Sequence, residues 1–265
     1  MSNLFKRSFS GLVYVALFIF SILYSRESYI LFVAILGLIC IWEFSRIIKF
    51  KSPITYLFFI AIIYLFLKRP DTYAIVFVLG VTIYSSLLLI YQLFMKKEIL
   101  FNKQREKFGL IIRYLVFSLS FIVLVPFFNG VYHKYLMVCI LILIWVNDSF
   151  AFLIGKNFGK RKLFESVSPK KTIEGFIGGL LFAVCTSYII SIYNKNFIFL
   201  HWMIIAIIIS SIGTVGDLVE SKFKRFANVK DSGNIMPGHG GILDRLDSLL
   251  FVAPFVYLYV KFIIN

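Results

Sequence analysis

Cysteine, histidine and acidic residues are all scarce in this chain. Its 265 residues include 3 Cys, 3 His and 13 Asp plus Glu. Cys40, Cys139 and Cys185 stand alone in apolar runs without C-x-x-C spacing, which indicates packing residues in a reduced setting. His133 and His201 fall in predicted outer loops, where interfacial positions are expected. The sequence therefore offers few side chains for chemistry, and those few carry the argument.

Apolar residues take the place of the missing polar ones. The chain is 60% hydrophobic and 18% aromatic, which is too apolar for a soluble domain of this size. We predict an all-α, polytopic integral membrane protein with about nine transmembrane helices. The apolar runs that predict them are Phe9–Tyr24, Tyr29–Trp42, Pro53–Leu67, Thr72–Met95, Tyr114–Phe128, Tyr135–Ile154, Ile173–Tyr193, Phe197–Val215 and Leu246–Ile264.

The basic residues predict how these spans are oriented. Several runs are shorter than the roughly 20 residues that cross a hydrocarbon core. With nine spans, however, 22 of the 28 Lys and Arg fall on one side and 6 on the other. This asymmetry favours nine spans with the N-terminus in the cytoplasm and the C-terminus outside. Orientation and anionic lipid headgroups also account for the net charge of +15, so no nucleic-acid partner is expected.

The predicted spans divide the chain into two regions. Residues 1–110 form an N-terminal transmembrane region of about four spans, with Glu43 expected to pair with Arg46. Residues 111–265 form a catalytic transmembrane region of about five spans, with cytoplasmic catalytic loops at 155–172 and 216–248. The first run could instead be a secretory signal after Lys6 and Arg7, but no small-residue cleavage pattern follows it.

The scarce acids are concentrated near the C-terminus. Five of the 13 acidic residues lie between Asp217 and Asp247, together with five basic residues and the glycine-rich P-G-H-G-G stretch. Glycine-rich backbone can approach a ligand and direct N–H groups at anions. Asp244 and Asp247 have i, i+3 spacing and share one face if this segment opens a helix, so they could reach a common cation. The alternative is an ordinary cytoplasmic loop whose basic residues only set the orientation of the spans in the membrane. Such a loop would need no acidic residues, whereas this one has five.

A second group of polar residues precedes it. Asp148 lies inside the sixth apolar run, where an ionisable group is costly and functional use is the default; a carboxylate paired with a neighbouring helix is the alternative. Ser168–Thr172 reads S-P-K-K-T directly before the helix expected at Ile173, and helix N-termini bind anions. Glu174 is either a capping acid or a functional one.

Four of the acids lie at the cytoplasmic ends of three predicted spans: Asp148, Asp217, Asp244 and Asp247. Magnesium is commonly held by one or two carboxylates while it bridges substrate phosphates, and nearby lysines would carry the remaining phosphate charge. The residue types thus predict phosphate chemistry at a membrane surface.

The two polar groups resemble the signature of the phosphatidate cytidylyltransferases, or CDP-diacylglycerol synthases. Their pattern S-x-x-K-R-x-x-x-x-K-D-x-x-x-x-x-P-x-H-G-G-x-x-D-R-x-D is met at every fixed position from Ser221 to Asp247. A second block is matched by Asp148, Phe158–Lys160, Ser168–Thr172 and Glu174–Gly175. Phe152 and Ile173 depart from the Tyr and Trp that the family often has, which leaves the charged set intact.

The resemblance implies that CTP and phosphatidic acid react to give CDP-diacylglycerol and pyrophosphate in phospholipid biosynthesis. It further implies Mg²⁺, with a possible second, monovalent cation, and a homodimer in the cell inner membrane with its active site facing the cytoplasm. Implied metal ligands are Asp217, Asp244, Asp148 and Asp247. Implied catalytic residues are Asp217, Asp244, Asp247, Lys224, Arg225, His239 and Arg245. Implied substrate-binding residues are Ser168, Lys170, Lys171, Thr172, Lys222, Lys230, Asp231, Gly240 and Gly241.

Other functions stay open at this stage. A cytidylyltransferase for another lipid phosphate, such as an unsaturated archaeal ether lipid, or a CTP-dependent polyprenol kinase would use similar residues. A transporter would use Asp148 and Asp217 as ion-coupling groups, but transporter sites gather near the bilayer midplane and these acids gather at one face.

Overall fold

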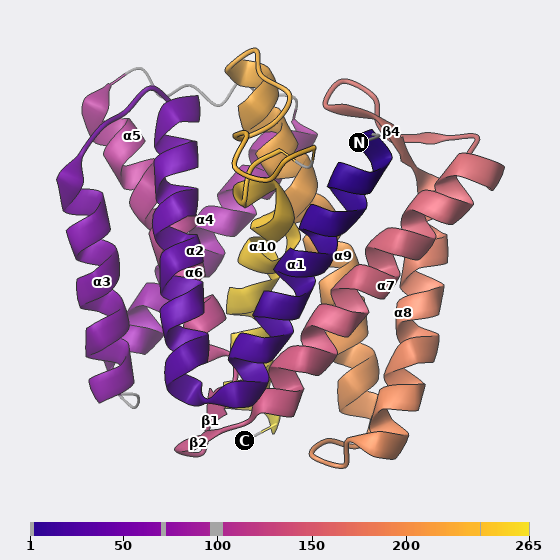
Figure 1. Ribbon diagram of the computed structural model, residues 1–265, viewed down its shortest axis with the longest axis horizontal. Helices are drawn as coiled ribbons and strands as arrows, with labels where there is room; N and C mark the ends of the chain where they lie inside the picture. The colour runs from indigo at the N-terminus through magenta and orange to yellow at the C-terminus, as the bar shows by residue number, and fades with distance from the viewer. Residues whose placement is uncertain (1–2, 70–72, 96–102, 239, 265) are drawn as a thin grey trace.

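The computed structural model describes residues 3–69, 73–95, 103–238 and 240–264. Within these ranges the chain forms a bundle of long helices with two small hairpins, and the helices run between an upper and a lower end (Figure 1). The N-terminal helices are α1 (Asn3–Tyr24), α2 (Arg26–Ile47), α3 (Pro53–Lys68) and α4 (Tyr73–Phe94). The Ser25 hydroxyl accepts the Ser28 N–H at 3.1 Å and caps α2.

The middle of the chain is a helical rod followed by a tight turn. The rod consists of α5 (Gln104–Leu110), the π-helical turn η1 (Ile111–Val116) and α6 (Phe117–Leu124). Strands β1 (Phe127–Phe128) and β2 (Val131–Tyr132) then pair antiparallel across Asn129 and Gly130. Both turn residues have positive φ, 51° and 71°, as a two-residue hairpin turn favours.

The C-terminal part contains the second hairpin and the remaining helices. In order these are α7 (Lys134–Phe158), β3 (Lys162–Phe164), β4 (Ser168–Thr172), α8 (Ile173–Tyr193), α9 (Phe199–Phe226), α10 (Leu243–Tyr259) and the π-helical turn η2 (Val260–Ile264). The two predicted catalytic loops are therefore largely ordered elements. An antiparallel hairpin fills most of 155–172, and only 227–242 separates α9 from α10.

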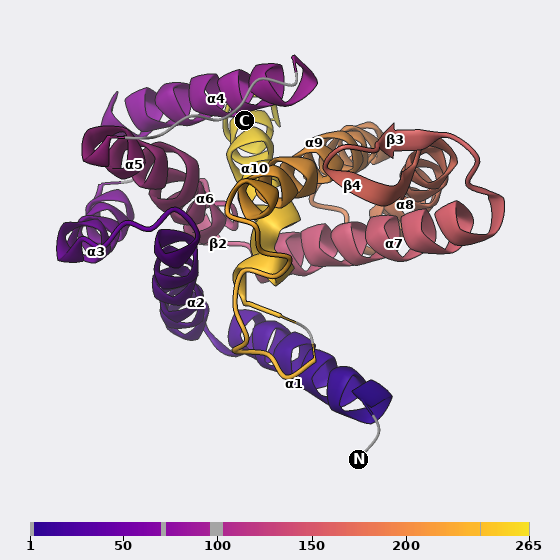
Figure 2. The same ribbon diagram turned by 90° about the horizontal axis from the view of Figure 1, so that it is seen from above.

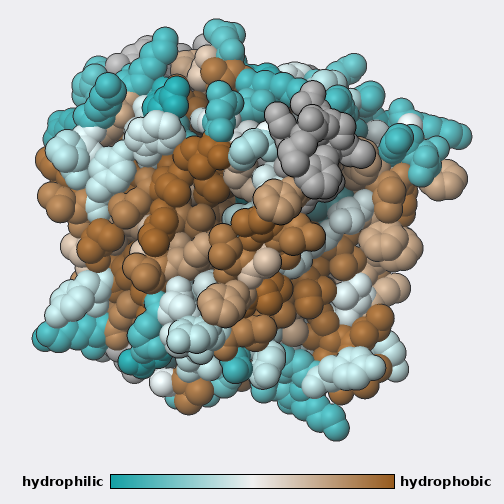
Figure 3. Space-filling view, in the orientation of Figure 1, coloured by the Kyte–Doolittle hydropathy of each residue, from teal (hydrophilic) through white to brown (hydrophobic). Residues whose placement is uncertain are grey.

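Among the described residues, seven helices are long and apolar enough to cross a membrane, and Phe9–Tyr24 and Pro53–Lys68 are shorter apolar helices. The predicted all-α polytopic membrane fold is confirmed, whereas the count of nine spans and the orientation stay predictions. The run expected at 29–42 is in fact the full-length helix α2, because polar residues at both of its ends are helical too. Figure 3 shows brown apolar side chains around the middle of the bundle and teal polar ones toward both ends.

Helix α10 holds the two halves of the bundle together. Figure 2 shows it between the N-terminal helices and the group formed by α7, α8 and α9. Residues 249–253 of α10 are each at most 3% exposed, so this helix is buried on every side. A Cβ at Gly216 of α9 would lie 2.4 Å from Phe251 Cβ, which shows how closely α9 and α10 approach. The start of α10 is therefore fixed from both directions.

Candidate active site

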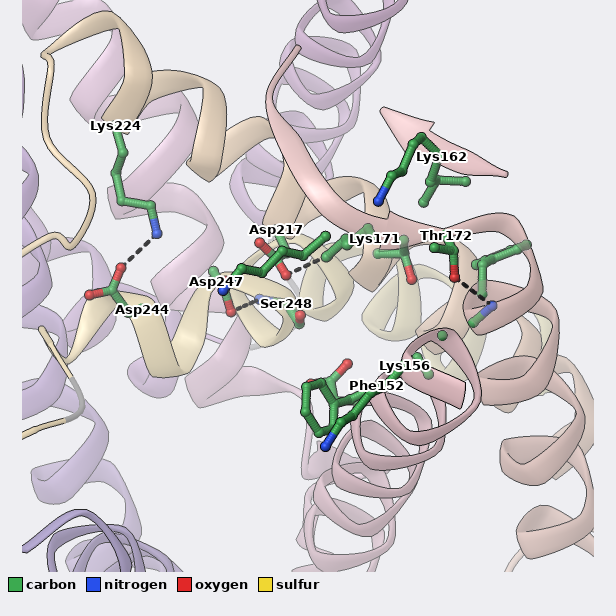
Figure 4. A pocket seen from close by; sticks show the side chains of 18 of the residues that line it. Phe152, Lys156, Lys162, Lys171, Thr172, Asp217, Lys224, Asp244, Asp247 and Ser248 are labelled. Atoms are coloured by element: carbon green, nitrogen blue, oxygen red, sulfur yellow. Dashed lines mark hydrogen bonds and ion pairs between the residues drawn. The ribbon is translucent and has the colours of Figure 1, made fainter. Parts of the chain in front are cut away.

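A cavity of about 650 Å³ lies at the upper end of the bundle, between α7, the β3–β4 hairpin, α9 and α10. Figure 4 shows Asp217, Asp244 and Asp247 on the α9 and α10 side, with Lys156 and Lys162 across the cavity. The acids in its lining are Asp148, Asp217, Asp231, Asp244 and Asp247, and the cations are Lys156, Lys162, Lys170, Lys171, Lys224 and Arg245. The cavity thus combines five carboxylates with six cationic side chains in one lining.

Close packing of α7 against α8 holds the hairpin over this cavity. A Cβ at Gly175 would lie 2.6 Å from the Ala151 carbonyl oxygen, and one at Gly179 would lie 2.7 Å from that of Asn147. Side chains at these positions would force the two helices apart.

Two side chains connect the hairpin to the start of α8. Thr172 Oγ1 accepts the Gly175 N–H at 3.1 Å and caps the helix. The Glu174 carboxylate accepts the backbone N–H groups of Lys160 and Arg161 at 3.0 and 3.1 Å. Of its two predicted roles, this geometry favours the structural one, because Glu174 fixes the chain where it leaves α7.

Lys171 brings the hairpin into contact with α9. Its Nζ forms an ion pair with Asp217 Oδ2, and the Ser221 hydroxyl donates to Asp217 Oδ1 at 3.2 Å. Both members of the ion pair are partly exposed to the cavity, at 28% and 30%. A phosphate entering the cavity can therefore compete with Asp217 for Lys171.

Three carboxylates from α9 and α10 form a compact acidic cluster. Oxygens of Asp217, Glu220 and Asp247 all lie within 4.8 Å of one another. Glu220 is fully buried, and its Oε1 has no hydrogen-bond partner among the described residues. Negative charges this close are costly without a cation, and Mg²⁺ takes carboxylate oxygens as ligands. The residues present therefore fit a divalent cation, and Glu220 belongs to the set although the sequence analysis did not select it.

Lys224 links this cluster to Asp244. Its Nζ forms an ion pair with Glu220 Oε2 and lies 2.7 Å from Asp244 Oδ1. The other oxygen, Asp244 Oδ2, accepts Ser232 N–H at 2.9 Å, Ser232 Oγ–H at 3.0 Å and Gly241 N–H at 2.8 Å. Asp244 thus organises the loop and orients Lys224. Its role as a metal ligand stays a prediction that would require these partners to be exchanged.

The segment from 227 to 242 folds around Asp244. Gly238 and Gly240 have positive φ of 76° and 91°, which glycine adopts at little cost. A Cβ at Gly240 would also lie 2.6 Å from Asp244 Oδ2. The Met236 N–H donates to the Gly240 carbonyl at 3.0 Å and closes the turn. His239 lies outside the described residues.

Glu43, from the N-terminal region, reaches the same loop. It is 0% exposed, and its carboxylate accepts the N–H groups of Ile242 and Leu243 at 3.1 and 2.8 Å. The expectation that it pairs with Arg46 is wrong: the Glu43 carboxylate faces Ser232, Ile242 and Leu243, whereas the Arg46 guanidinium lies 4.8 Å from the Trp42 ring centroid. An acid directly after an apolar run is the sequence signal that could have marked Glu43, because α2 continues past it to Ile47 and an ionisable group inside such a helix is costly.

Other predicted site residues lie outside the acidic cluster of Asp217, Glu220 and Asp247. Lys222 Nζ donates to the Gln92 carbonyl of α4 at 2.9 Å, and Arg225 donates to the Val229 carbonyl at 3.3 Å. Lys230 is exposed on the loop, and Ser168 begins β4. Asp148 lines the cavity with its carboxylate 3.2 Å from Asn147 Nδ2. The predicted roles of these side chains stay predictions.

Three relatives with known names are similar to part of this chain. The phosphatidate cytidylyltransferase of Bacillus subtilis (strain 168) is 50% identical over 117 residues, 44% of each chain. That of Staphylococcus saprophyticus is 48% identical over 114 residues, which are 43% of this chain and 44% of the relative. That of Staphylococcus epidermidis is 47% identical over 126 residues, 46% of each chain. The aligned part thus spans less than half the length of these relatives.

A broader match covers almost the entire chain. The model of the cytidylyltransferase family matches residues 5–263, from the first helix to the end of the last one. It includes α2, which carries Glu43, as well as the helices that carry the acidic cluster. This chain belongs to the cytidylyltransferase family.

Proposed function

We propose that this protein is a phosphatidate cytidylyltransferase, which joins CTP and phosphatidic acid to give CDP-diacylglycerol and pyrophosphate. The observation that carries the proposal is the cavity at one end of the membrane helices, where a cluster of carboxylates lies close to several lysines. The names of the relatives that match part of the chain support the same reaction.

The reaction needs charge neutralisation more than it needs a base. A phosphate monoester has a second pKa of about 6 and is mostly ionised at neutral pH, so its oxygen is already a nucleophile. That oxygen attacks the α-phosphorus of CTP, a P–O bond forms, and the bond to pyrophosphate breaks. Lysine side chains that orient both anions and offset their repulsion are the main requirement. Lys170, Lys171 and Lys224 line the cavity and are suited to this task.

Asp217, Glu220 and Asp247 are the residues that would hold Mg²⁺. A divalent cation between them would supply positive charge to the phosphate oxygens of the nucleotide. Asp217 would then be released from Lys171, which becomes available for a phosphate. Asp148 lines the same cavity and is a further candidate ligand, as is Asp244 if Lys224 turns away from it. A second, monovalent cation stays part of the proposal.

The apolar part of the cavity is suited to a lipid. Phe152 and Phe176 line it, and 67% of Phe152 is exposed. Phosphatidic acid would place its phosphate among the lysines while its acyl chains stay among the apolar helices. We further propose that the cavity faces the cytoplasm from the inner membrane and that the protein works as a homodimer.

The position of the label in CTP tests the reaction. Protein purified in detergent is given phosphatidic acid, Mg²⁺ and CTP labelled in either the α- or the γ-phosphate. Cytidylyl transfer moves the α label into lipid and releases the γ label as pyrophosphate, whereas a CTP-dependent kinase moves the γ label into lipid. Asp247→Asn is the inactive control. Absence of both labels from lipid, with wild-type protein shown to be folded, contradicts the proposal and favours a transporter.

A further inference from the structure

Glu43 and Asp244 share one partner in the loop between α9 and α10. The Ser232 hydroxyl lies 3.1 Å from Glu43 Oε2 and 3.0 Å from Asp244 Oδ2. Glu43 comes from α2, and 189 residues separate it from Ser232 in the sequence. The contact therefore joins the N-terminal region to the loop that hydrogen-bonds Asp244, the partner of Lys224.

The same carboxylate also binds the first turn of α10. The N–H groups at a helix start lack intrahelical partners and carry partial positive charge, so a carboxylate there is stabilising. Glu43 accepts the N–H groups of Ile242 and Leu243, directly before Asp244. Because Glu43 is 0% exposed, water offers no substitute for these bonds. Loss of the carboxylate would leave the N–H groups of Ile242 and Leu243 without this acceptor, and the Ser232 hydroxyl with Asp244 Oδ2 alone.

Two glycines in the loop leave room for Glu43. A Cβ at Gly233 would lie 2.4 Å from Glu43 Oε1, and its three nearest atoms all belong to Glu43. A Cβ at Gly241 would lie 2.5 Å from both Glu43 carboxylate oxygens and 2.0 Å from Ser232 Oγ. The loop therefore packs closely around the Glu43 side chain, and glycine at 233 and 241 avoids a clash with its carboxylate.

We propose that Glu43 is a positioning residue that sets the place of Asp244, and through it of Lys224, relative to the acidic cluster. This inference rests on the proposed function for its catalytic consequence but not for its structural one. It gives the N-terminal region a part in the reaction, because α2 contributes a side chain to the organisation of the active site.

The primary test compares Glu43→Gln with Ser45→Ala in detergent. Ser45 is buried on the same helix, two residues along, and outside this hydrogen-bond group. Glu43→Gln keeps size but replaces one acceptor oxygen with a donor, so kcat per folded molecule should fall at least ~10-fold, or about 1.4 kcal/mol, at temperatures below melting. Ser45→Ala should keep wild-type kcat. A purely structural role would lower the melting temperature and leave kcat and KM of the folded molecules unchanged, which would overturn the proposal.

Hydrogen exchange gives a readout that does not depend on the reaction. In Glu43→Gln, amides of residues 232 and 241–243 should exchange faster than in wild type, while those in the middle of α2 stay protected. Ser232→Ala removes the hydroxyl partner of Glu43 in the loop, so the same amides should exchange faster. This variant replaces Glu43→Gln in the test if Glu43→Gln does not fold. Unchanged exchange in both variants would overturn the proposal. If wild type makes no CDP-diacylglycerol, the proposed function fails and the exchange result still decides the role of Glu43.

A double-mutant cycle tests the contact itself. Gly233→Ala should lower kcat in wild type because its methyl group meets the Glu43 carboxylate, and it should cost little more in a Glu43→Ala background. An equal loss in both backgrounds would show that Gly233 serves some other contact.

Discussion

At the residue scale, Lys224 connects the two groups of acids. It is 8% exposed, and it contacts Glu220 of the acidic cluster and Asp244 in the first turn of α10. Removing one partner of such a buried pair leaves the other charge uncompensated, which costs more than the pair contributes. The position of Lys224 is therefore sensitive to changes on either side.

A cycle of Lys224→Gln and Asp244→Asn measures this coupling. Each change alone should lower kcat at least ~100-fold, about 2.7 kcal/mol. The kcat of the double variant should be no lower than that of the less active single variant, because each change alone already breaks the ion pair between Lys224 and Asp244. The measurement is kcat and KM for CTP at saturating Mg²⁺, with exposed Lys195→Gln at the other end of the bundle as control. Additive losses would mean that the two residues act separately.

Glu220 provides the test of the metal site. Because its Oε1 is buried and unpartnered among the described residues, Glu220→Gln should weaken the cation site and raise the Mg²⁺ concentration for half-maximal activity ~10-fold. Exposed Glu165→Gln is the matched control. EDTA should abolish activity in both, and added Mg²⁺ should restore it. Wild-type Mg²⁺ dependence in Glu220→Gln would remove this residue from the ligand set.

At the element scale, the spacing of charged residues along α9 and α10 decides which of their contacts could be predicted from the sequence. Asp217, Glu220 and Lys224 are three and four residues apart, which places them on one face of α9 once the helix is known to continue to Phe226. The apolar run ended at Val215, so the sequence placed these residues in a loop and Glu220 was not selected. The i, i+3 pair Asp244 and Asp247 does open a helix, yet the two acids contact different partners.

Contacts between elements far apart in the chain could not be predicted from a single sequence. Glu43 meets Ile242 across 199 residues, and periodicity carries no information about such pairs. The β3–β4 hairpin was likewise missed, because its lysines and serines resemble an irregular basic loop. The long apolar helices, in contrast, follow directly from hydropathy, because the bilayer requires internally hydrogen-bonded segments.

The contact of α7 with α8 can be tested with a methyl group. Gly175→Ala would place a Cβ 2.6 Å from a backbone oxygen of α7, so the helices must separate and the hairpin with Lys171 must shift. We expect a loss of ~1–3 kcal/mol in stability, typical of overpacking, with reduced activity. Gly80→Ala on α4, where a Cβ meets nothing within 4 Å, is the control and should be neutral. Melting curves in detergent compare the two, and equal melting temperatures would contradict the tight contact.

At the scale of the whole molecule, the two ends of the bundle differ in chemistry. The cavity, its lysines and the loop around Asp244 lie at the upper end, where α1 begins, and η2 ends at the lower one (Figure 1). Both proposed substrates are anionic, and in the proposed function CTP reaches the cavity from the cytoplasm. The proposed function therefore requires the upper end to face the cytoplasm, which is the side that receives 22 of the 28 basic residues.

Thiol labelling in intact cells tests this orientation. Val229→Cys places a cysteine in the exposed loop near Asp244, and Lys195→Cys places one between α8 and α9 at the other end. Both are made in a Cys185→Ala background, because the remaining Cys40 and Cys139 are buried and so react slowly. An impermeant maleimide should label Lys195→Cys in intact cells and Val229→Cys only after permeabilisation. Labelling of both in intact cells would place an even number of crossings between them, and labelling of Val229→Cys alone would turn the cavity away from its CTP supply.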